Sequence, residues 1–176
     1  ISDCLVGSEM CIRDSFSSGY IDPSSLAHLA EIYHKRGELI APTNVVNLRN
    51  FSKLHEANRN LKEALLHYRK SIILQPSDSE ANRLFFGALT KSKQYTPALL
   101  WFKFSRPIIE VDYISRFHLA DCCKSGPQPN EGRSINLLKH CVLLTPSWPV
   151  SLHDLALLKQ NVGEILSSIN YFLRAY

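Results

Sequence analysis

The stretch LKEALLHYRKSIILQPSD, residues 61–78, decides the fold, because its pattern of residue types returns, in whole or in part, three times later in the chain. The pattern places a small residue, a large residue, a second small residue and a proline at offsets 0, 4, 7 and 12, here Ala64, Tyr68, Ser71 and Pro76. Its first place recurs at Ala64, Ala98, Ser134 and Ser168, so the residue number rises in successive steps of 34, 36 and 34. A near-constant interval of this length predicts a chain of repeated supersecondary units.

A second helical pattern precedes each copy of the first one. Apolar or small residues recur at i, i+3, i+4 and i+7 in LRNFSKLHEANRN (48–60), SEANRLFFGALTKSK (79–93), YISRFHLADCCKSG (113–126) and SLHDLALLKQNVG (151–163). That spacing gives a helix one apolar face. Pro76 and Pro146 come just after the other helical segment of their repeats, where a proline ends a helix. Each repeat is therefore predicted to be a helix A, a short turn, a helix B and a second turn.

These patterns resemble the tetratricopeptide repeat (TPR) family, whose motif reads W-x2-L-G-x2-Y, then A-x3-F, then P, over about 34 residues. The resemblance covers residues 45–176, in repeats near 45–78, 79–112, 113–148 and 149–176, of which the last is cut short. It implies an all-α fold, an α-solenoid of antiparallel helix pairs wound into a right-handed superhelix. We expect residues 16–44 to be a partial repeat or a capping helix.

The helix A half of the motif departs from the family more than the helix B half. Phe86 stands at the place of the small glycine, which predicts that the helices separate locally or shift by one residue toward Gly87. The longer interval, from Ala98 to Ser134, contains two extra residues, and GPQPNEG, residues 126–132, has the composition of a loop that could hold them.

Residues 23–42 allow two interpretations. The segment PSSLAHLAEIYHKRGEL matches helix A at the motif places Leu26, Leu29, Ala30 and Tyr33. However, the step from Pro42 to Pro76 equals the step from Ala64 to Ala98, so the segment also fits a helix B that ends near Pro42. We favour the helix B interpretation because it keeps the repeat interval.

The first residues, ISDCLVGSEMCIRDS, resemble an artefact. Residues 5–15 match the translation of a transposase-type sequencing adapter without a gap. We therefore expect residues 1–15 to be a non-native tail, and we exclude them from the fold. The chain is then expected to be a fragment of a longer protein, read from environmental (metagenomic) or transcript DNA.

The composition is that of a globular chain, with 45% hydrophobic and 20% charged residues. No apolar run reaches the roughly 18–20 residues that a membrane-spanning helix needs, so we expect no membrane partner. The net charge is +4, and it becomes +6 without the tail, because Asp3, Glu9, Asp14 and Arg13 sum to −2. This charge is dispersed along the chain, and we expect no nucleic-acid partner.

In TPR arrays helix A lines a concave groove, so the resemblance implies a scaffold that binds a peptide or a partner protein there. The fifth and ninth positions of the repeats hold Arg49 and Lys53, Arg83 and Gly87, Phe117 and Asp121, and His153 and Leu157. Arg49, Lys53 and Arg83 are expected to form a basic cluster that binds an acidic peptide through charge-assisted hydrogen bonds. The alternative is a solvated basic helix face that binds nothing.

Two functions follow from the resemblance. The first is a protein-interaction scaffold with no enzymatic activity and no cofactor. The second is the repeat arm of a larger enzyme, because Asn50, at the sixth position of its repeat, resembles the groove asparagines of O-linked N-acetylglucosamine transferases. We favour the scaffold, with Arg49, Asn50, Lys53, Arg83, Asp121 and His153 as candidate groove residues.

Cysteine and histidine residues also gather in the third repeat. His118 and Cys122 stand at i and i+4, with Cys123, His140 and Cys141 close by, and such residues can bind zinc or form a Cys–His nucleophile. However, Cys123 and Cys141 occupy packing places of the motif, where a free cysteine behaves as a small hydrophobic residue. We therefore expect no metal site. Three cysteines outside the tail favour a reducing compartment, and we expect a cytoplasmic protein.

Overall fold

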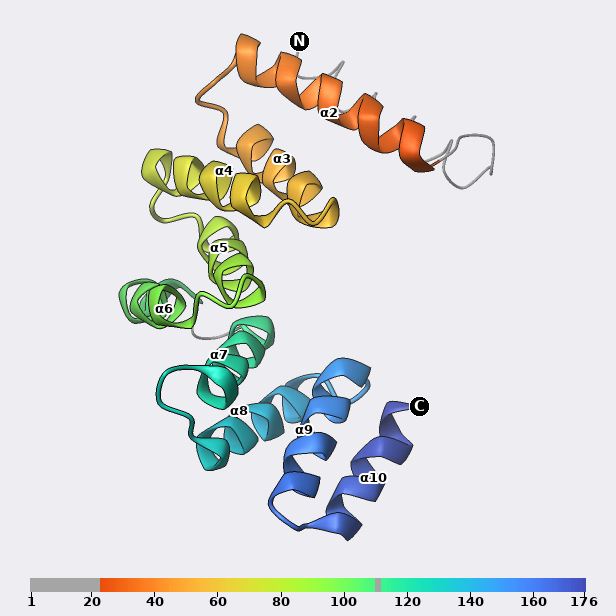
Figure 1. The fold of residues 1–176 in the computed structure, drawn as a ribbon. Helices are drawn as coiled ribbons and strands as arrows, with labels where there is room; N and C mark the ends of the chain where they lie inside the picture. The colour runs from red at the N-terminus through yellow and green to blue at the C-terminus, as the bar shows by residue number, and fades with distance from the viewer. Residues whose placement is uncertain (1–22, 110–111) are drawn as a thin grey trace. The chain divides into compact units, whose positions relative to one another are not determined.

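The computed structural model describes residues 23–109 and 112–176, and every regular element in those two ranges is an α-helix (Figure 1). The helices are α2 (Pro23–Ile40), α3 (Val45–Ala57), α4 (Leu61–Leu74), α5 (Ser79–Lys91), α6 (Tyr95–Ile109), α7 (Tyr113–Ser125), α8 (Glu131–Leu144), α9 (Pro149–Asn161) and α10 (Ile165–Ala175). The all-α fold is therefore confirmed. The expected adapter-derived tail, residues 1–15, lies outside the described residues.

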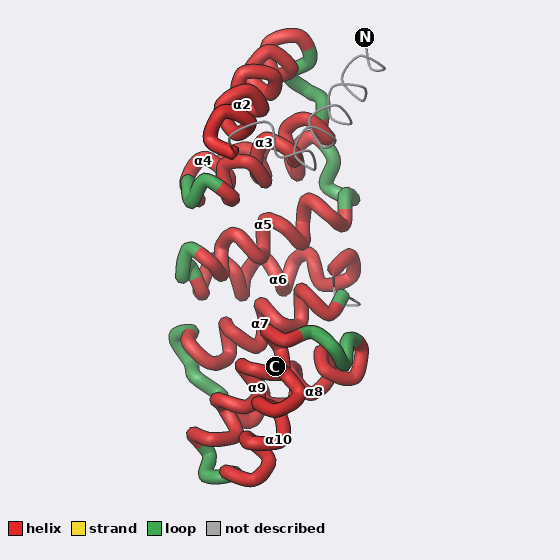
Figure 2. The backbone as a smooth tube through the Cα atoms, turned by 90° about the vertical axis from the view of Figure 1, so that its right-hand side faces the viewer, coloured by secondary structure: helices red, strands yellow, loops and turns green. Residues whose placement is uncertain are grey.

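The chain divides into two compact units, and the division falls after Leu74. The N-terminal unit contains α2, α3 and α4, and the C-terminal unit contains α5 to α10. Within each unit, short loops join the consecutive helices whose connections the structure describes, as the tube in Figure 2 shows. Helices α3 and α4, α5 and α6, α7 and α8, and α9 and α10 pack against each other as antiparallel hairpins.

The turns explain the unequal repeat intervals. Three residues separate the two helices of the first, second and fourth hairpins, at 58–60, 92–94 and 162–164, whereas five residues, 126–130, separate α7 from α8. The two additional residues account for the longer interval between Ala98 and Ser134, as the composition of that segment predicted. The short turns contain residues with positive φ, at Arg59, Lys93 and Gly163.

Small residues at the start of the helix B motif lie at the centre of each hairpin. Ala64, Ala98 and Ser134 are fully buried and Ser168 is nearly so, and a small side chain there allows the two helix backbones to approach. Ser134 also donates a hydrogen bond from its Oγ to the carbonyl oxygen of Ala120, over 2.8 Å. The serine side chain thus links α8 to α7 by a hydrogen bond, although it is only slightly larger than that of alanine.

In the N-terminal unit, α2 packs beside the hairpin of α3 and α4. Leu48 and Phe51 of α3 are buried in the hairpin with Tyr68 of α4. Helix α2 packs on α3 through His34, whose Nδ1 lies 2.9 Å from Asn47 Oδ1, and through Gly37, which also adjoins Asn47. The segment 23–40 is thus one helix, next to α3 in both sequence and space.

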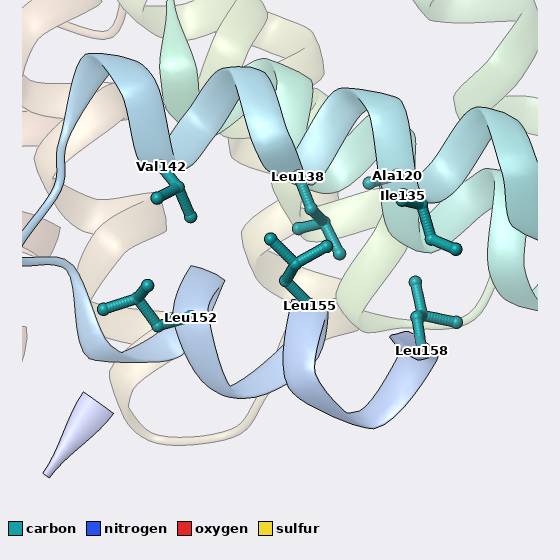
Figure 3. Close-up of a cluster of buried hydrophobic side chains, with 7 residues drawn as sticks. All are labelled: Ala120, Ile135, Leu138, Val142, Leu152, Leu155 and Leu158. Atoms are coloured by element: carbon teal, nitrogen blue, oxygen red, sulfur yellow. The ribbon is translucent and has the colours of Figure 1, made fainter. Parts of the chain in front are cut away.

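In the C-terminal unit a core cluster joins neighbouring hairpins. Ile135, Leu138 and Val142 of α8 face Leu152, Leu155 and Leu158 of α9, and Ala120 of α7 completes the cluster (Figure 3). All of these side chains are buried. Helix α8 therefore packs both on its own helix A, α7, and on the helix A of the next repeat, as stacked two-helix repeats do.

Candidate functional site

The sequence-predicted site residues all lie on helices A, but they belong to different units. Arg49, Asn50 and Lys53 are on α3, in the N-terminal unit. Arg83, Asp121 and His153 are on α5, α7 and α9, in the C-terminal unit. The basic cluster of Arg49, Lys53 and Arg83 would combine both units, so it stays a prediction. The C-terminal residues can be described together.

Arg83 forms an ion pair with a residue that the sequence analysis missed. Its Nε lies 3.2 Å from Oδ2 of Asp112, and the two side chains are 24% and 28% exposed. The other carboxylate oxygen of Asp112 accepts a hydrogen bond from the backbone N–H of Ile114, so Asp112 also caps the N-terminus of α7. The positive charge of Arg83 is thereby compensated in the isolated chain.

Asp121 forms part of a second charged group, which joins α7 to α9. Lys124 Nζ lies 3.9 Å from Asp121 Oδ1 and 3.8 Å from Asp154 Oδ2. Burial raises the pKa of the Asp121 carboxyl, Lys124 opposes the rise and the Asp154 charge adds to it. His153, the neighbour of Asp154 in sequence, has its Nδ1 3.7 Å from Asp154 Oδ1 and its ring against Phe172 of α10.

These charges form two separate groups, the pair Arg83–Asp112 and the group of Asp121, Lys124 and Asp154, which we call together the ion-pair ladder. It links the successive helices A of the C-terminal unit, α5 to α7 and α7 to α9. Two cations and three carboxylates give it a formal charge of −1. Each partly exposed pair contributes only about 0.2–1 kcal/mol to folding. The ladder is therefore too weak to hold the fold, and a ligand could displace its contacts at small cost.

The other residues at predicted groove positions are mostly engaged in packing. The ring of Phe117 lies 4.9 Å from that of Trp148, centroid to centroid. Gly87 is covered by His118, because a Cβ added at Gly87 would lie 2.7 Å from His118 Nε2. Leu157 is 39% exposed. The helix A positions thus divide into packed apolar places and partly exposed charged ones.

His118 is held in its neutral form. Burial lowers the pKa of His118 to about 4, and the charges of Lys91 and Arg83 act in the same direction. The ring packs edge-on against Phe86, with centroids 6.0 Å apart. At neutral pH this histidine is an uncharged packing residue between α5 and α7.

The cysteines are buried thiols. Cys122 Sγ lies 3.7 Å from Thr90 Oγ1, and Cys141 donates a hydrogen bond from Sγ to the carbonyl oxygen of Tyr113. Burial raises the pKa of both thiols to about 11, so they are protonated at neutral pH. Among residues 23–109 and 112–176, no group of three or more His, Cys, Asp or Glu side chains is placed to hold a metal ion.

None of the described helices is long and apolar enough to cross a membrane. The expected cytoplasmic location stays a prediction, and so does the expectation that the chain has no enzymatic activity of its own.

Antiparallel hairpins with small residues at the helix contact, repeated at a near-constant interval of sequence, define a TPR-like helical repeat protein. Solved structures with the same fold support this class, although their sequences are distant. No protein-family model matches the chain, and no curated protein matches its sequence.

Three of these solved structures illustrate the likeness. The chain is similar to MamA (residues 41 to the end) from Desulfovibrio magneticus RS-1, with 16% identity and a TM-score of 0.72 over 95% of this chain and 90% of that one. The chain is also similar to PilW, a type IV pilus biogenesis factor, with 15% identity and a TM-score of 0.75 over 94% of this chain and 73% of that one. A third similar structure is YrrB, described as a TPR protein with an unusual peptide-binding site. It shares 11% identity, with a TM-score of 0.64 over 93% of this chain and 80% of that one. Identities this low establish the shared fold alone.

Proposed function

We propose that the chain is a protein-interaction scaffold that binds a peptide segment of a partner protein on the exposed side of its helices A. The observation that carries this proposal is the ion-pair ladder. It contains partly exposed charges at two contacts between helices A, that of Arg83 with Asp112 between α5 and α7, and that of Lys124 with Asp121 and Asp154 between α7 and α9. The TPR-like fold and the peptide-binding site attributed to YrrB support the same function.

Charged side chains in such an arrangement can recognise a peptide by exchanging partners. When a peptide carboxylate approaches Lys124 or Arg83, it replaces an intramolecular ion pair with a charge-assisted hydrogen bond that is further removed from water. The weakness of the existing pairs keeps the cost of this exchange small. Recognition of this kind depends on the sequence of the ligand more than on its hydrophobicity.

The partner that we propose is an acidic or carboxyl-terminal peptide. Its carboxylates would be held on α3 by Arg49, Asn50 and Lys53, of which Lys53 is exposed and the other two are partly buried. Arg83 is already compensated by Asp112, so the preference for acidic ligands rests mainly on α3. In the C-terminal unit, Asp121 and His153 would contact a peptide that binds to the helices A of that unit.

The test is a titration with three peptides of equal length, one acidic, one neutral and one basic. We expect the acidic peptide to bind most tightly. Arg49→Glu should weaken its binding to the N-terminal unit, and Lys124→Glu its binding to the C-terminal unit, each at least about tenfold, or about 1.4 kcal/mol. Lys139→Glu is the matched control, since Lys139 is exposed on α8, a helix B, and should leave the affinity unchanged.

Circular dichroism should show the same helicity for all variants. The proposal fails if none of the three peptides binds, or if the control variant loses as much affinity as the helix A variants. Tightest binding of the basic peptide would reject the acidic partner and would leave the scaffold itself in place.

A further inference from the structure

Three histidine rings from three different helices surround a buried phenylalanine in the N-terminal unit. Phe51 of α3 is 3% exposed, and the ring of His34 from α2 stacks on it with centroids 5.7 Å apart. The rings of His55 on α3 and His67 on α4 lie closer to Phe51, at 4.4 Å and 4.7 Å. We call His34, His55 and His67 the histidine cluster. Its rings act as packing groups at the place where α2, α3 and α4 meet.

His67 is poorly placed to carry a charge. It is 6% exposed, and its Nδ1 is buried with no hydrogen-bond partner among the described residues. Burial lowers the pKa of the His67 imidazole below its usual value. The charges of Lys70 and His55 act in the same direction, and those of Glu38 and Glu63 oppose the shift without cancelling it. The packed unit therefore favours the neutral ring.

Glu38 of α2 faces this nitrogen, but its charge is already engaged. Its Oε1 lies 3.9 Å from His67 Nδ1, which is beyond hydrogen-bond distance. The same oxygen accepts a hydrogen bond from Lys70 Nζ over 3.0 Å. The Nδ1 atom of His67 thus lies on the side of α4 that α2 covers, and water can reach it when α2 moves away.

The two other helices bring a second histidine against His67. The rings of His55 and His67 are parallel to within 4°, with centroids 5.5 Å apart. Neutral rings pack well in such a stack, whereas two imidazolium rings repel each other. Glu31 of α2 also acts on His55, but it is paired with Lys35 over 2.8 Å. Both carboxylates that α2 presents to the cluster, Glu31 and Glu38, are therefore held by lysines.

Helix α2 is the element that can separate without unfolding the rest of the unit. The hairpin of α3 and α4 has a buried core of its own, which includes Leu48, Ala64 and Tyr68. The contacts of α2 are largely polar: His34 Nδ1 lies 2.9 Å from Asn47 Oδ1, and Glu38 pairs with Lys70. Partly exposed polar contacts of this kind contribute little to stability, so α2 can leave before the hairpin opens.

We propose that the histidine cluster is a pH-sensitive switch that releases α2 from the α3/α4 hairpin in weak acid. The folded unit disfavours the charged form of His67, so the stabilisation by its neutral ring is complete above the usual histidine pKa of 6.5 and decreases as the pH falls below it. Release of α2 exposes Nδ1 to water and allows the ring to take up its proton. The cluster includes none of the candidate groove residues, so the switch is independent of the proposed peptide site.

The test is hydrogen exchange of the full 176-residue chain, followed by mass spectrometry at about pH 7.5 and about pH 5.5. After correction for the intrinsic exchange rate, the protection of the α2 amides should fall at least about tenfold at the lower pH, while the α4 amides keep theirs. His67→Phe keeps an aromatic ring that cannot be protonated, so its α2 protection should be the same at both pH values. His140→Phe is the matched control, because His140 is exposed on α8, in the C-terminal unit, and this variant should respond like the wild type.

Glu38→Gln keeps the test decisive if His67→Phe does not fold, which circular dichroism would show. This change removes a carboxylate that opposes the lowering of the His67 pKa, so the release of α2 should begin at a higher pH than in the wild type. Unchanged α2 protection in the wild type, or an equal loss in α2 and α4, would overturn the proposal. An acid response that persists in His67→Phe or disappears in His140→Phe, or a release that Glu38→Gln does not shift upward, would overturn it as well.

Discussion

The hairpins α5/α6 and α7/α8 make the equivalent contact with different side chains. In α7/α8 two small residues meet, Ala120 and Ser134, and the serine hydroxyl bonds to the alanine carbonyl. In α5/α6 the helix B residue is again small, Ala98, but the residue equivalent to Ala120 is Phe86, whose large ring is fully buried. The two hairpins thus share the small helix B residue and differ in helix A.

The surroundings of Phe86 show how the second hairpin accommodates a ring. Its centroid lies 5.3 Å from that of Phe102 on α6 and 6.0 Å from that of His118 on α7. Phe86 therefore fills space between repeats as well as within its own hairpin, while Gly87 makes room for His118. The helix B position, held by Ala98 or Ser134, therefore requires a small residue. The helix A position, held by Phe86 or Ala120, can hold a large or a small residue, provided that the side chains of the next helix A fit it.

Removal of the Phe86 ring should have the largest effect on stability. Phe86→Ala leaves a cavity between α5, α6 and α7, and we expect the free energy of unfolding to fall by about 3–5 kcal/mol. Urea denaturation followed by circular dichroism measures the loss. Phe104→Ala, on the exposed face of α6, should change it by less than about 0.5 kcal/mol. A loss for Phe86→Ala as small as that of the control would show that the ring is not part of a core.

Lowering the pH should reduce the free energy of unfolding, because the buried His118 packs against Phe86 in its neutral form. Its pKa in the folded chain is about 4, below the usual value of 6.5, so the unfolded chain binds the additional proton first. Stability should therefore fall as the pH drops from about 6.5 toward 4, by up to about 3 kcal/mol, and this residue should contribute no pH dependence above that range. Unfolding curves of the wild type and His118→Leu, measured at several pH values, test this. Parallel pH profiles for the two proteins would contradict the burial of a neutral His118.

A methyl group at Gly87 tests the close approach of α5 and α7. Gly87→Ala places a Cβ 2.7 Å from His118 Nε2, and the shift of the ring should cost about 1–3 kcal/mol of unfolding free energy. Combination with His118→Ala should remove most of this additional cost, which a double-mutant cycle measures. Additive losses in the cycle would mean that the two residues are not in contact.

The serine hydroxyl of the α7/α8 hairpin should have the smallest effect. Ser134→Ala keeps the small volume but leaves the Ala120 carbonyl without this donor, so we expect a loss of about 0.5–1.5 kcal/mol in the same urea assay. The converse variant, Ala98→Ser, is the control, because it introduces a serine at the equivalent position of the α5/α6 hairpin. It measures the effect of the hydroxyl where the native residue is alanine. A larger loss at Ser134 than at Phe86 would reverse the order that the structure predicts.

Local sequence patterns predicted the helices and their interval because these depend on contacts between near neighbours. The helical spacing of apolar residues located each helix A, and the spacing from Ala64 to Pro76 located helix B. The longer loop after α7 was visible in the composition of residues 126–132.

The charged contacts were harder to predict because their partners belong to different helix pairs, far apart in sequence. Asp112 was recognisable only as a residue before a helix, and nothing in the sequence indicated that its second oxygen would bind Arg83. Asp154 likewise stands at no recognisable motif position. Its contact with Lys124 depends on how α9 packs against α7, which the local sequence does not indicate. A basic groove was expected because Arg83 stands at a recognisable motif position, whereas its carboxylate partner Asp112 does not.

The central claim is that buried apolar contacts of helices A and B hold the fold, whereas partly exposed charged residues of helix A determine what is bound. The most direct measurement is a titration of Lys124→Glu with the acidic peptide, together with urea denaturation of the same sample. The account predicts at least about tenfold weaker binding, with an unfolding free energy within about 1 kcal/mol of the wild type. Unchanged affinity, or a loss of affinity that only accompanies unfolding, would contradict it.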